Sequence, residues 1–363
     1  MLPVYAVIAA AVVVVPGAEL VEPEESAHSA SAVMQEDRLI HLDEKGQVRV
    51  WRLRDGSFDA ATSAGFARDD LTHLATDGTQ LWAAGASNVY RWSSPDRSWK
   101  SAANFSQKRY PVRGFAVVDG RPLLVLETGV MDAVTKRTYT TPGDNQLALM
   151  KLESSIWIGP DYSGGRRRLF PQYYNPVSLF PFPLRNTVSV LGTKSKLWIG
   201  TSQGEWGGTL YGLNPASGSW VRYGDSLHYV TGITQDSAGE LIVSWSMSHF
   251  DADTEIRRHR SDAKLSREFP LLKAQYYQTV AFNPFDGKLY GVEQRDVVTI
   301  SDGMPTKIAE LAGRVYEKEP MALGVAPGIG SLLPFAPGAL VVVPKSGLPW
   351  LLRDGKLTRL TEP

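Results

Sequence analysis

The chain has 363 residues, of which 43% are hydrophobic and 21% charged, a composition typical of folded globular proteins and not of disordered ones. Its 38 basic and 38 acidic side chains balance, so charge gives no indication of nucleic-acid binding. Cysteine is absent, which excludes disulfides and thiolate-bound metals, while 33 glycines, 23 prolines and 10 tryptophans favour short strands joined by tight turns.

The N-terminal segment has the composition of an export signal. Residues 2–15 form an uncharged run rich in alanine and valine that ends at Pro16-Gly17. A run of this length is short for a membrane-spanning helix and suits the apolar part of a signal peptide. We therefore expect residues 1–18 to be a signal peptide or membrane anchor and residues 19–37 to be an acidic flexible linker. A buried first strand at 12–15 is the alternative.

This segment also indicates where the protein works. We expect an exported protein, which is periplasmic, on the cell surface or secreted. Contact with a membrane is expected only through the N-terminal segment, if that segment is not cleaved.

A repeat of short apolar segments runs from about residue 38 onward. Each copy contains an apolar strand, often with tryptophan, which usually follows a hairpin turn and precedes an alternating strand. These apolar strands begin at Leu39, Leu81, Leu123, Ile156, Leu197, Leu241, Leu289 and Leu340. Their spacing, roughly 40 to 45 residues, is the length of one four-stranded blade in WD40-like propellers.

The repeat predicts an all-β fold, a β-propeller of four-stranded antiparallel blades over residues 38–363, because stacked blades bury each other's faces. The long helices that an α/β barrel needs between its strands are missing from the pattern. Eight copies predict eight blades. Seven is the alternative, because the first copy has a poor inner strand and the step from the third copy to the fourth is short. The strand at 357–360 is expected to lie beside the first repeat and close the ring.

The best-formed copy resembles a known repeat. Leu197–Thr201, of sequence Leu-Trp-Ile-Gly-Thr, is followed by a Leu-Tyr strand and an Asn-Pro turn within Leu210–Trp220. This order is similar to the two-component-regulator propeller repeat, and Ile156–Gly159 and Leu81–Trp82 are weaker copies. The resemblance implies an extracytoplasmic sensory or binding propeller.

Propellers bind ligands over the central channel, on the face that carries the entry loops of the inner strands and the turns between second and third strands. Here those connections are longest in the fourth to sixth repeats, where aromatic residues mix with carboxylates and arginines. Such residues suit a saccharide, a peptide or a protein partner, although structural roles in turns and blade edges remain open for them. The candidate ligand-binding residues are Tyr162, Arg166, Tyr173, Tyr174, Glu205, Trp206, Tyr229, His249 and Asp251.

Metal and cofactor signatures are weak. Asp251 and Asp253 alternate as calcium ligands do, but the glycine and spacing of an EF-hand are missing, so a solvated acidic turn is the preferred interpretation. The 6 histidines are not at metal-ligand spacing, and no nucleophile elbow, P-loop or dinucleotide fingerprint occurs. The sequence therefore assigns no catalytic residue, no metal and no cofactor.

The leading hypothesis is a non-enzymatic propeller that binds a protein, a peptide or a saccharide, with nucleic acid excluded as a partner. The alternative is a lyase or hydrolase acting on a sugar or lactone, for which Glu205, His228, His249 and Asp251 are the candidate acids and bases. A third hypothesis is a structural scaffold without a concave pocket.

Overall fold

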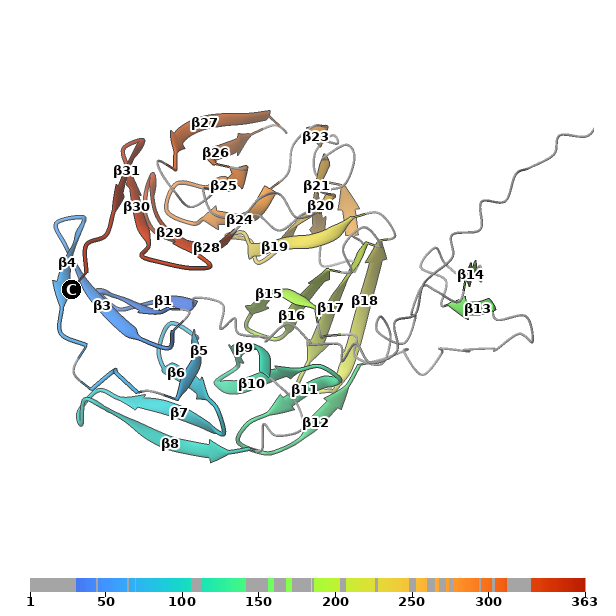
Figure 1. Ribbon diagram of the computed structural model, residues 1–363, viewed down its shortest axis with the longest axis horizontal. Coiled ribbons are helices and arrows are strands. Elements are labelled where there is room, and N and C mark those ends of the chain that lie inside the picture. Colours follow the sequence, from blue (N-terminus) through green and yellow to red (C-terminus); the bar gives the residue numbers. More distant parts are fainter. Residues whose placement is uncertain are drawn as a thin grey trace, which may run out of the picture.

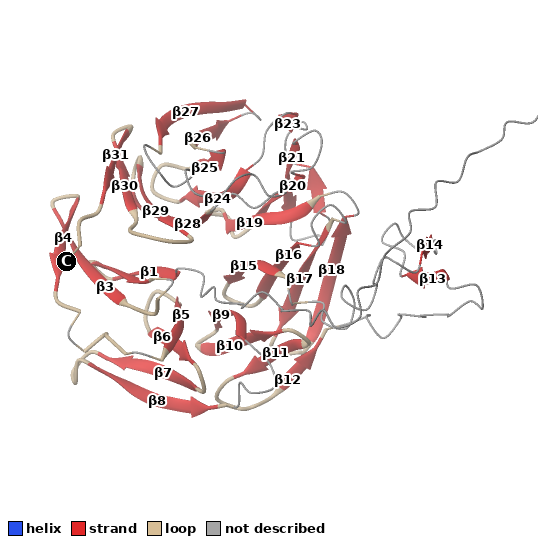
Figure 2. Cartoon of the chain, in the orientation of Figure 1, coloured by secondary structure: helices blue, strands red, loops and turns tan. Residues whose placement is uncertain are grey.

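Antiparallel strands dominate the described part of the chain, in which no helix occurs (Figure 2). The computed structural model describes residues 31–362 except 44, 64, 69, 106–111, 142–155, 160–167, 172–183, 185, 203–206, 226–227, 248–252, 260–264, 268–271, 274–276, 294, 302–303 and 312–327. Seven sheets, each built on four strands hydrogen-bonded in sequence order, surround a common centre (Figure 1). We number these blades along the chain, and each runs from an inner strand at the centre to an outer strand at the rim.

The first four blades occupy the N-terminal two thirds of the chain. Blade 1 comprises β1 (Ser31–Gln35), β2 (Arg38–Leu42), β3 (Val48–Arg54) and β4 (Ser57–Ala61). Blade 2 comprises β5 (Leu71–Thr76), β6 (Leu81–Gly85), β7 (Asn88–Ser93) and β8 (Ser98–Asn104). Blade 3 comprises β9 (Val112–Val118), β10 (Arg121–Leu126), β11 (Gly129–Asp132) and β12 (Thr138–Thr140). Blade 4 comprises β15 (Thr187–Gly192), β16 (Leu197–Ser202), β17 (Gly208–Asn214) and β18 (Ser219–Asp225).

The last three blades complete the ring. Blade 5 comprises β19 (Tyr229–Gln235), β20 (Leu241–Met247), β21 (Asp253–His259) and β22 (Leu265–Arg267), with β23 (Leu272–Lys273) also paired to β21. Blade 6 comprises β24 (Tyr277–Asn283), β25 (Lys288–Glu293), β26 (Asp296–Ser301) and β27 (Met304–Glu310). Blade 7 comprises β28 (Ile329–Ala336), β29 (Ala339–Pro344), β30 (Trp350–Arg353) and β31 (Lys356–Arg359).

The predicted propeller of four-stranded antiparallel blades is confirmed, but eight blades is wrong and the alternative of seven is right. The surplus copy is the segment that begins at Ile156. It forms β13 (Ile156–Gly159), which among the described strands pairs only with β14 (Arg168–Pro171) in a separate two-stranded sheet. Figure 1 shows this sheet outside the ring. A strand with the local pattern of a blade strand forms part of a blade only when three further strands complete the sheet in register.

The first blade begins earlier than the sequence pattern indicated. Strand β1 starts at Ser31, inside the segment 19–37 that was expected to be a linker. It pairs antiparallel with β2 over its whole length, and Val33 is only 8% exposed. A short run of small and apolar residues can serve as an inner strand because neighbouring blades cover it.

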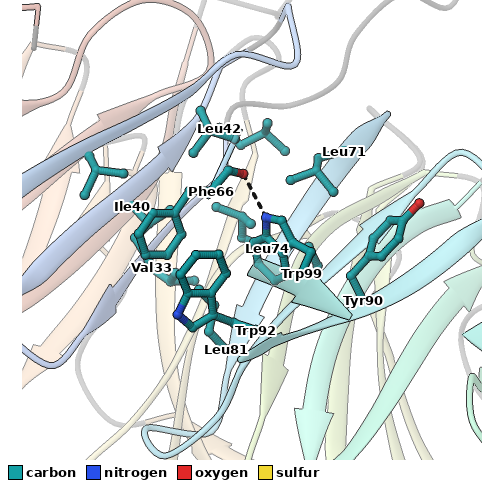
Figure 3. Packing of buried hydrophobic residues seen from close by; sticks show 13 residues of the cluster. Val33, Ile40, Leu42, Phe66, Leu71, Leu74, Leu81, Tyr90, Trp92 and Trp99 are labelled. Atoms are coloured by element: carbon teal, nitrogen blue, oxygen red, sulfur yellow. Dashed lines mark hydrogen bonds between the residues drawn. The ribbon is translucent and has the colours of Figure 1, made fainter. Parts of the chain in front are cut away.

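Each blade buries its faces against its neighbours, and the seam between blades 1 and 2 shows how. Phe66, in the connection from β4 to β5, stacks on Trp92 with ring centroids 3.9 Å apart and an interplanar angle of 11° (Figure 3). Trp99 meets Trp92 edge-on at 5.3 Å, and its Nε1 donates to the carbonyl oxygen of Phe66 at 2.8 Å. We call Phe66, Trp92 and Trp99 the aromatic seam. It joins the connection from blade 1 firmly to the outer half of blade 2.

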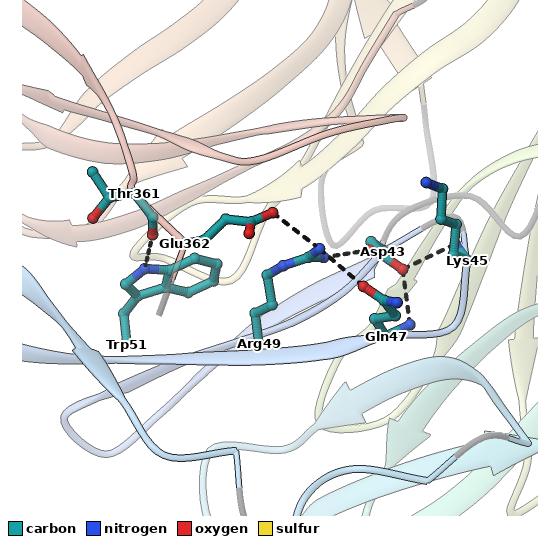
Figure 4. Close-up of polar contacts among 7 residues, drawn as sticks. All are labelled: Asp43, Lys45, Gln47, Arg49, Trp51, Thr361 and Glu362. Carbon is teal, nitrogen blue, oxygen red and sulfur yellow. Dashed lines mark hydrogen bonds and ion pairs between the residues drawn. The ribbon is translucent and has the colours of Figure 1, made fainter.

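The ring closes between blades 7 and 1, as predicted for the C-terminal strand. Trp51 Nε1 donates to the carbonyl oxygen of Thr361 at 2.9 Å (Figure 4). Arg49 pairs with Asp43 within blade 1 and lies 3.5 Å from a carboxylate oxygen of Glu362. Because every blade in the described part of the chain is built from consecutive strands, closure depends on side-chain packing between blades 1 and 7 and on contacts with the C-terminal residues, and not on a shared strand.

Candidate functional site

The propeller has two faces of different construction. On one face of the propeller, a connection joins the first strand of each blade to the second, as at 77–80 in blade 2. The connection from the third strand to the fourth lies on the same face, as at 354–355 in blade 7. Antiparallel neighbours reverse direction at each connection, so the remaining connections leave from the opposite face. These include 203–207, 248–252 and 311–328. We call the first the turn face and the second the loop face.

A β-bulge recurs where the inner strands start at the loop face. In six of the seven blades, one residue near the start of the inner strand has no partner in the second strand. These residues are Thr72, Arg113, Val188, Thr231, Gln278 and Gly330. A bulge bends the strand and redirects a side chain. We call this set, placed around the loop-face end of the channel, the bulge ring.

Polar members of the bulge ring are engaged in the scaffold. Thr72 Oγ1 donates to the carbonyl oxygen of Ala84 at 3.1 Å, and Thr231 Oγ1 lies 2.9 Å from Ser244 Oγ. Gln278 Oε1 accepts a hydrogen bond from the Ile329 backbone N–H at 2.6 Å, which links blade 6 to blade 7. Val188 is different, since this apolar residue is 43% exposed. It offers a contact surface where a ligand over the channel would lie.

Arg113 is the charged member of the bulge ring. Its Nε donates to Glu127 Oε1 at 3.2 Å, and the two side chains are 19% and 12% exposed. The backbone oxygen of Glu127 accepts the Leu184 N–H at 3.0 Å, just before the inner strand of blade 4. The pair therefore lies where blades 3 and 4 meet, partly screened from water, and its charges can act strongly on a bound group.

A second polar cluster lies at the loop face of blade 2 and comprises Arg68, Asp70 and Tyr90. Arg68 Nε donates to Asp70 Oδ1 at 2.9 Å, and Tyr90 Oη donates to Asp70 Oδ2 at 2.5 Å. Burial raises the pKa of Asp70, but the hydrogen bonds from Tyr90 and Arg68 outweigh it and hold the pKa below its usual value. Burial and the Asp70 carboxylate raise the pKa of Tyr90. The cluster fixes the connection that leads from blade 1 into blade 2.

Blade 6 carries a carboxyl group with an altered affinity for protons. Glu293 ends β25 opposite Tyr277, which is fully buried. Burial, and then the negative charge of Asp296, raise the pKa of Glu293. Burial and the charge of Glu293 raise the pKa of Tyr277. Lys307 Nζ neutralises Asp296 at 2.8 Å, so the charge of Glu293 is less well compensated than that of its neighbour.

Most of the residues predicted to bind ligand lie outside the described residues. They are Tyr162, Arg166, Tyr173, Tyr174, Glu205, Trp206, His249 and Asp251. Glu205 and Trp206 lie in the connection from β16 to β17, and His249 and Asp251 in that from β20 to β21, both of which leave from the loop face. The other four lie within the long connection from β12 to β15, with Tyr162 and Arg166 between β13 and β14 of the sheet outside the ring, and not in a turn between the second and third strands of a blade as expected. The candidates therefore belong to connections that start and end on this face.

One ligand-binding candidate, Tyr229, is described and is buried, as is His228, a candidate acid or base of the enzyme alternative. Tyr229, the first residue of β19, is 8% exposed, and its neighbour His228 is 7% exposed. The backbone of Gly208 approaches Tyr229 so closely that a Cβ there would lie 2.7 Å from the Tyr229 Cα. Both side chains therefore pack within the loop-face edge of blade 5.

Asp253, the weak calcium candidate, is the first residue of β21 and pairs with Lys273 in β23. Among the described residues, no group of three or more His, Cys, Asp or Glu side chains could hold a metal ion. Asp251 is outside that set, so the calcium hypothesis stays a prediction. Within the same part of the chain, no helix is long and apolar enough to cross a membrane.

The bulge ring, the Arg113–Glu127 pair and the Asp70 cluster are not predictable from the sequence pattern. A bulge is set by the pairing register between strands, which a single sequence does not display. Arg68 and Asp70 meet Tyr90 of β7 only through the fold, since it is 20 or more residues away along the chain.

No protein-family model matches the sequence, and no curated protein matches it. Solved structures do. The chain is similar to the GH74 xyloglucanase from Xanthomonas campestris, with 15% identity and a TM-score of 0.53 over 91% of this chain and 52% of that one. It is also similar to the Dos1 propeller, with 12% identity and a TM-score of 0.51 over 94% of this chain and 85% of that one.

A third neighbour is YCF48, whose structure was solved bound to D1 peptide. It shares 11% identity and a TM-score of 0.50 over 92% of this chain and 93% of that one. At these identities the comparisons support the propeller fold alone. The resemblance to the two-component-regulator propeller repeat is confirmed as far as the fold, and the repeat type stays a prediction.

Proposed function

We propose that this protein is an exported, non-enzymatic propeller that binds a protein or peptide segment over the loop-face end of its channel. The observation that carries the proposal is the difference between the two faces. The turn face is closed by hairpin turns, whereas the longer connections and the bulge ring belong to the loop face. Rigid scaffolds of this kind commonly place binding residues on such connections.

The chemistry of the loop face supports a protein or peptide partner. Val188 supplies exposed apolar surface, and Arg113 of the bulge ring, with its partner Glu127, supplies both signs of charge beside it. The neighbouring connections add the aromatic candidates Trp206 and Tyr174. Interfaces between proteins are enriched in aromatic and arginine anchors surrounded by polar groups. A neighbour of the same fold binds a peptide, which supports this class of ligand.

Export is the second part of the proposal, and it is argued from the sequence. The uncharged run at 2–15 has the length of a signal h-region. The absence of cysteine fits an exported protein only if the core alone stabilises it. The seven seams between blades provide such a core.

The loop face can be tested with a matched pair of exposed valines. Peptides selected from a display library on the full chain serve as the ligand. Val188→Asp places a charge on the loop face, and Val134→Asp places the same charge on the turn face, where Val134 is 52% exposed. We expect Val188→Asp to weaken binding by about tenfold or more and Val134→Asp to leave it unchanged, as measured by titration calorimetry. Equal effects of the two changes would show that the loop face is not the site.

A second variant tests the aromatic candidates. The double change Trp206→Ala and Tyr174→Ala should abolish binding of the same peptides, because large aromatic side chains dominate interface energies. The control is Phe285→Ala in the turn between β24 and β25, where Phe285 is 55% exposed on the turn face. Normal binding by the double variant would exclude these connections as the binding surface.

A further inference from the structure

A separate groove lies between the outer halves of blades 1 and 2. It has a volume of about 600 Å³, which is within the range of ligand-binding clefts. One wall includes Arg54, which ends β3, and the other includes Arg97 in the turn from β7 to β8. Both residues adjoin turns on the turn face. The groove is therefore distinct from the loop-face site.

The floor of the groove follows one strand face and then a strand edge. Val50, Arg52 and Arg54 alternate along β3, so their side chains share the face turned toward blade 2. The lining then continues through the last three residues of β4, 59–61, and on to Thr62 in the connection that follows. Because consecutive side chains of a strand point to opposite faces, three strand residues in a row line a groove only along the strand edge. β4 is the last strand of its sheet, so this edge carries backbone groups that β3 does not pair.

The charge of the groove is strongly positive. Its lining holds four arginines, Arg38, Arg52, Arg54 and Arg97, but a single carboxylate, Asp59. Arg52 is already neutralised, because its Nε lies 2.6 Å from Asp37 Oδ2, and Arg38 approaches the same carboxylate at 3.8 Å. Arg54 and Arg97 are exposed and form no ion pair with any described residue. Two unneutralised guanidinium groups therefore face the groove from opposite blades.

The wall that carries Arg97 is held in place. Gly65 packs against the Arg97 backbone so tightly that a Cβ would lie 2.2 Å from the Arg97 carbonyl oxygen. Arg97 itself has φ of 46°, and Phe66 and Trp92 of the aromatic seam belong to the same lining. A site whose walls are fixed before binding loses less entropy when a ligand arrives.

We propose that this groove binds an acidic peptide in an extended conformation, with its carboxylates on Arg54 and Arg97 and its backbone along the edge of β4. Guanidinium groups match carboxylates in geometry and charge, and an exposed strand edge offers a ladder of backbone hydrogen bonds to an extended chain. Asp59 favours a peptide over a uniformly anionic polymer. Its carboxylate would repel phosphate or sulfate groups but accepts hydrogen bonds from peptide N–H groups.

The test uses a fluorescent peptide of alternating glutamate and threonine, with a glutamine–threonine peptide as the neutral probe, both titrated against the full chain. The groove variant combines Arg54→Gln with Arg97→Asn, since asparagine tolerates the positive φ at that position. The control variant combines Arg91→Gln with Arg222→Gln, which removes two exposed arginines elsewhere. Neither groove arginine forms an ion pair with a described residue, and all four substituted arginines are exposed, so both variants should fold, which thermal melts will check.

We expect only the acidic probe to bind, the groove variant to weaken it by about tenfold or more, and the control variant to bind normally. Hydrogen exchange should slow in β4 when the acidic peptide is present. Val188→Asp should leave this binding intact, which separates it from the loop-face proposal. Equal losses in the two arginine variants, or no binding by the wild-type chain, would overturn the assignment. If polygalacturonate binds more tightly than the acidic peptide, and the groove variant weakens that binding, the ligand is an acidic saccharide and the peptide assignment is overturned.

Discussion

The carboxyl group of Glu293 lies in surroundings that disfavour its ionised form. Burial and the neighbouring Asp296 raise its pKa above the usual 4.5. The folded protein therefore binds this proton more readily than the unfolded chain does. By linkage, the free energy of unfolding decreases as pH rises from about 4 through the raised pKa of Glu293. The group destabilises the fold at neutral pH.

We predict that Glu293→Gln raises the melting temperature at pH 7, because the amide keeps the size of the side chain without its charge. The gain should shrink as pH falls and disappear below about pH 4, where the wild-type carboxyl is protonated. Calorimetric melts across this range would measure it. Glu310→Gln is the matched control. The hydrogen bond from Lys307 lowers the pKa of Glu310, so that change should remove stability at pH 7.

Individual residues were the hardest part to predict from the sequence. The aromatic residues around Tyr229 predict a ligand contact there, yet Tyr229 is buried at the start of β19. Exposure depends on the neighbouring blade, and nothing local in the sequence specifies it. The role of Arg113 could not be predicted, because both its contact with Glu127 and its bulge depend on the register between β9 and β10.

At the scale of strands, a chain of buried hydroxyl groups links blade 5 to blade 6. Ser246 Oγ lies 2.8 Å from Thr254 Oγ1 and donates to the Tyr277 carbonyl oxygen at 3.3 Å. Thr254 Oγ1 accepts the Tyr277 backbone N–H at 3.3 Å, and Thr254 is fully buried. Hydrogen bonds shielded from water hold neighbouring elements in one arrangement.

Thr254→Val should test this link, because valine has nearly the same shape but no hydroxyl group. We expect the free energy of unfolding to fall by about 1–3 kcal/mol, as measured by urea denaturation. Thr140→Val, at an exposed position in β12, is the control and should change it by less than about 0.5 kcal/mol. A result in which the two changes cost the same would mean that the hydroxyl chain contributes nothing beyond side-chain size.

The strands themselves were largely predictable. The apolar segments beginning at Leu81 and Leu197 are β6 and β16, because a strand covered on both faces has a distinctive apolar run. The segment at Ile156 has the same apolar run, which is why the pattern alone predicts an eighth blade there. Local composition identifies a strand, but the number of partners depends on the residues around it.

At the scale of the molecule, the ring depends on its one seam between distant parts of the sequence. The last residues of the chain contact blade 1 through Trp51 and Arg49. Leu360 packs with Leu39 and Trp51 from blade 1 and with Val341 from blade 7. These contacts hold the first and last blades together without a shared strand.

Removal of Thr361 to Pro363 should therefore loosen the ring. We expect a loss of about 1–3 kcal/mol in the free energy of unfolding, with faster hydrogen exchange in blades 1 and 7 than in blades 3 and 4. Glu362→Gln alone should cost little, because its side chain is 72% exposed and a surface ion pair contributes little. Uniform acceleration of exchange around the ring would contradict a local role for this seam.

Because no blade takes one of the described strands from the opposite end of the chain, the order of synthesis can also be the order of assembly. A newly made chain can complete blade 1 before blade 2 has emerged, and each later blade finds a finished wall to pack against. Only the final seam must wait for the C-terminus. Until then, the face of blade 1 that later packs against blade 7 is exposed, and it is the surface of the nascent chain most prone to aggregation.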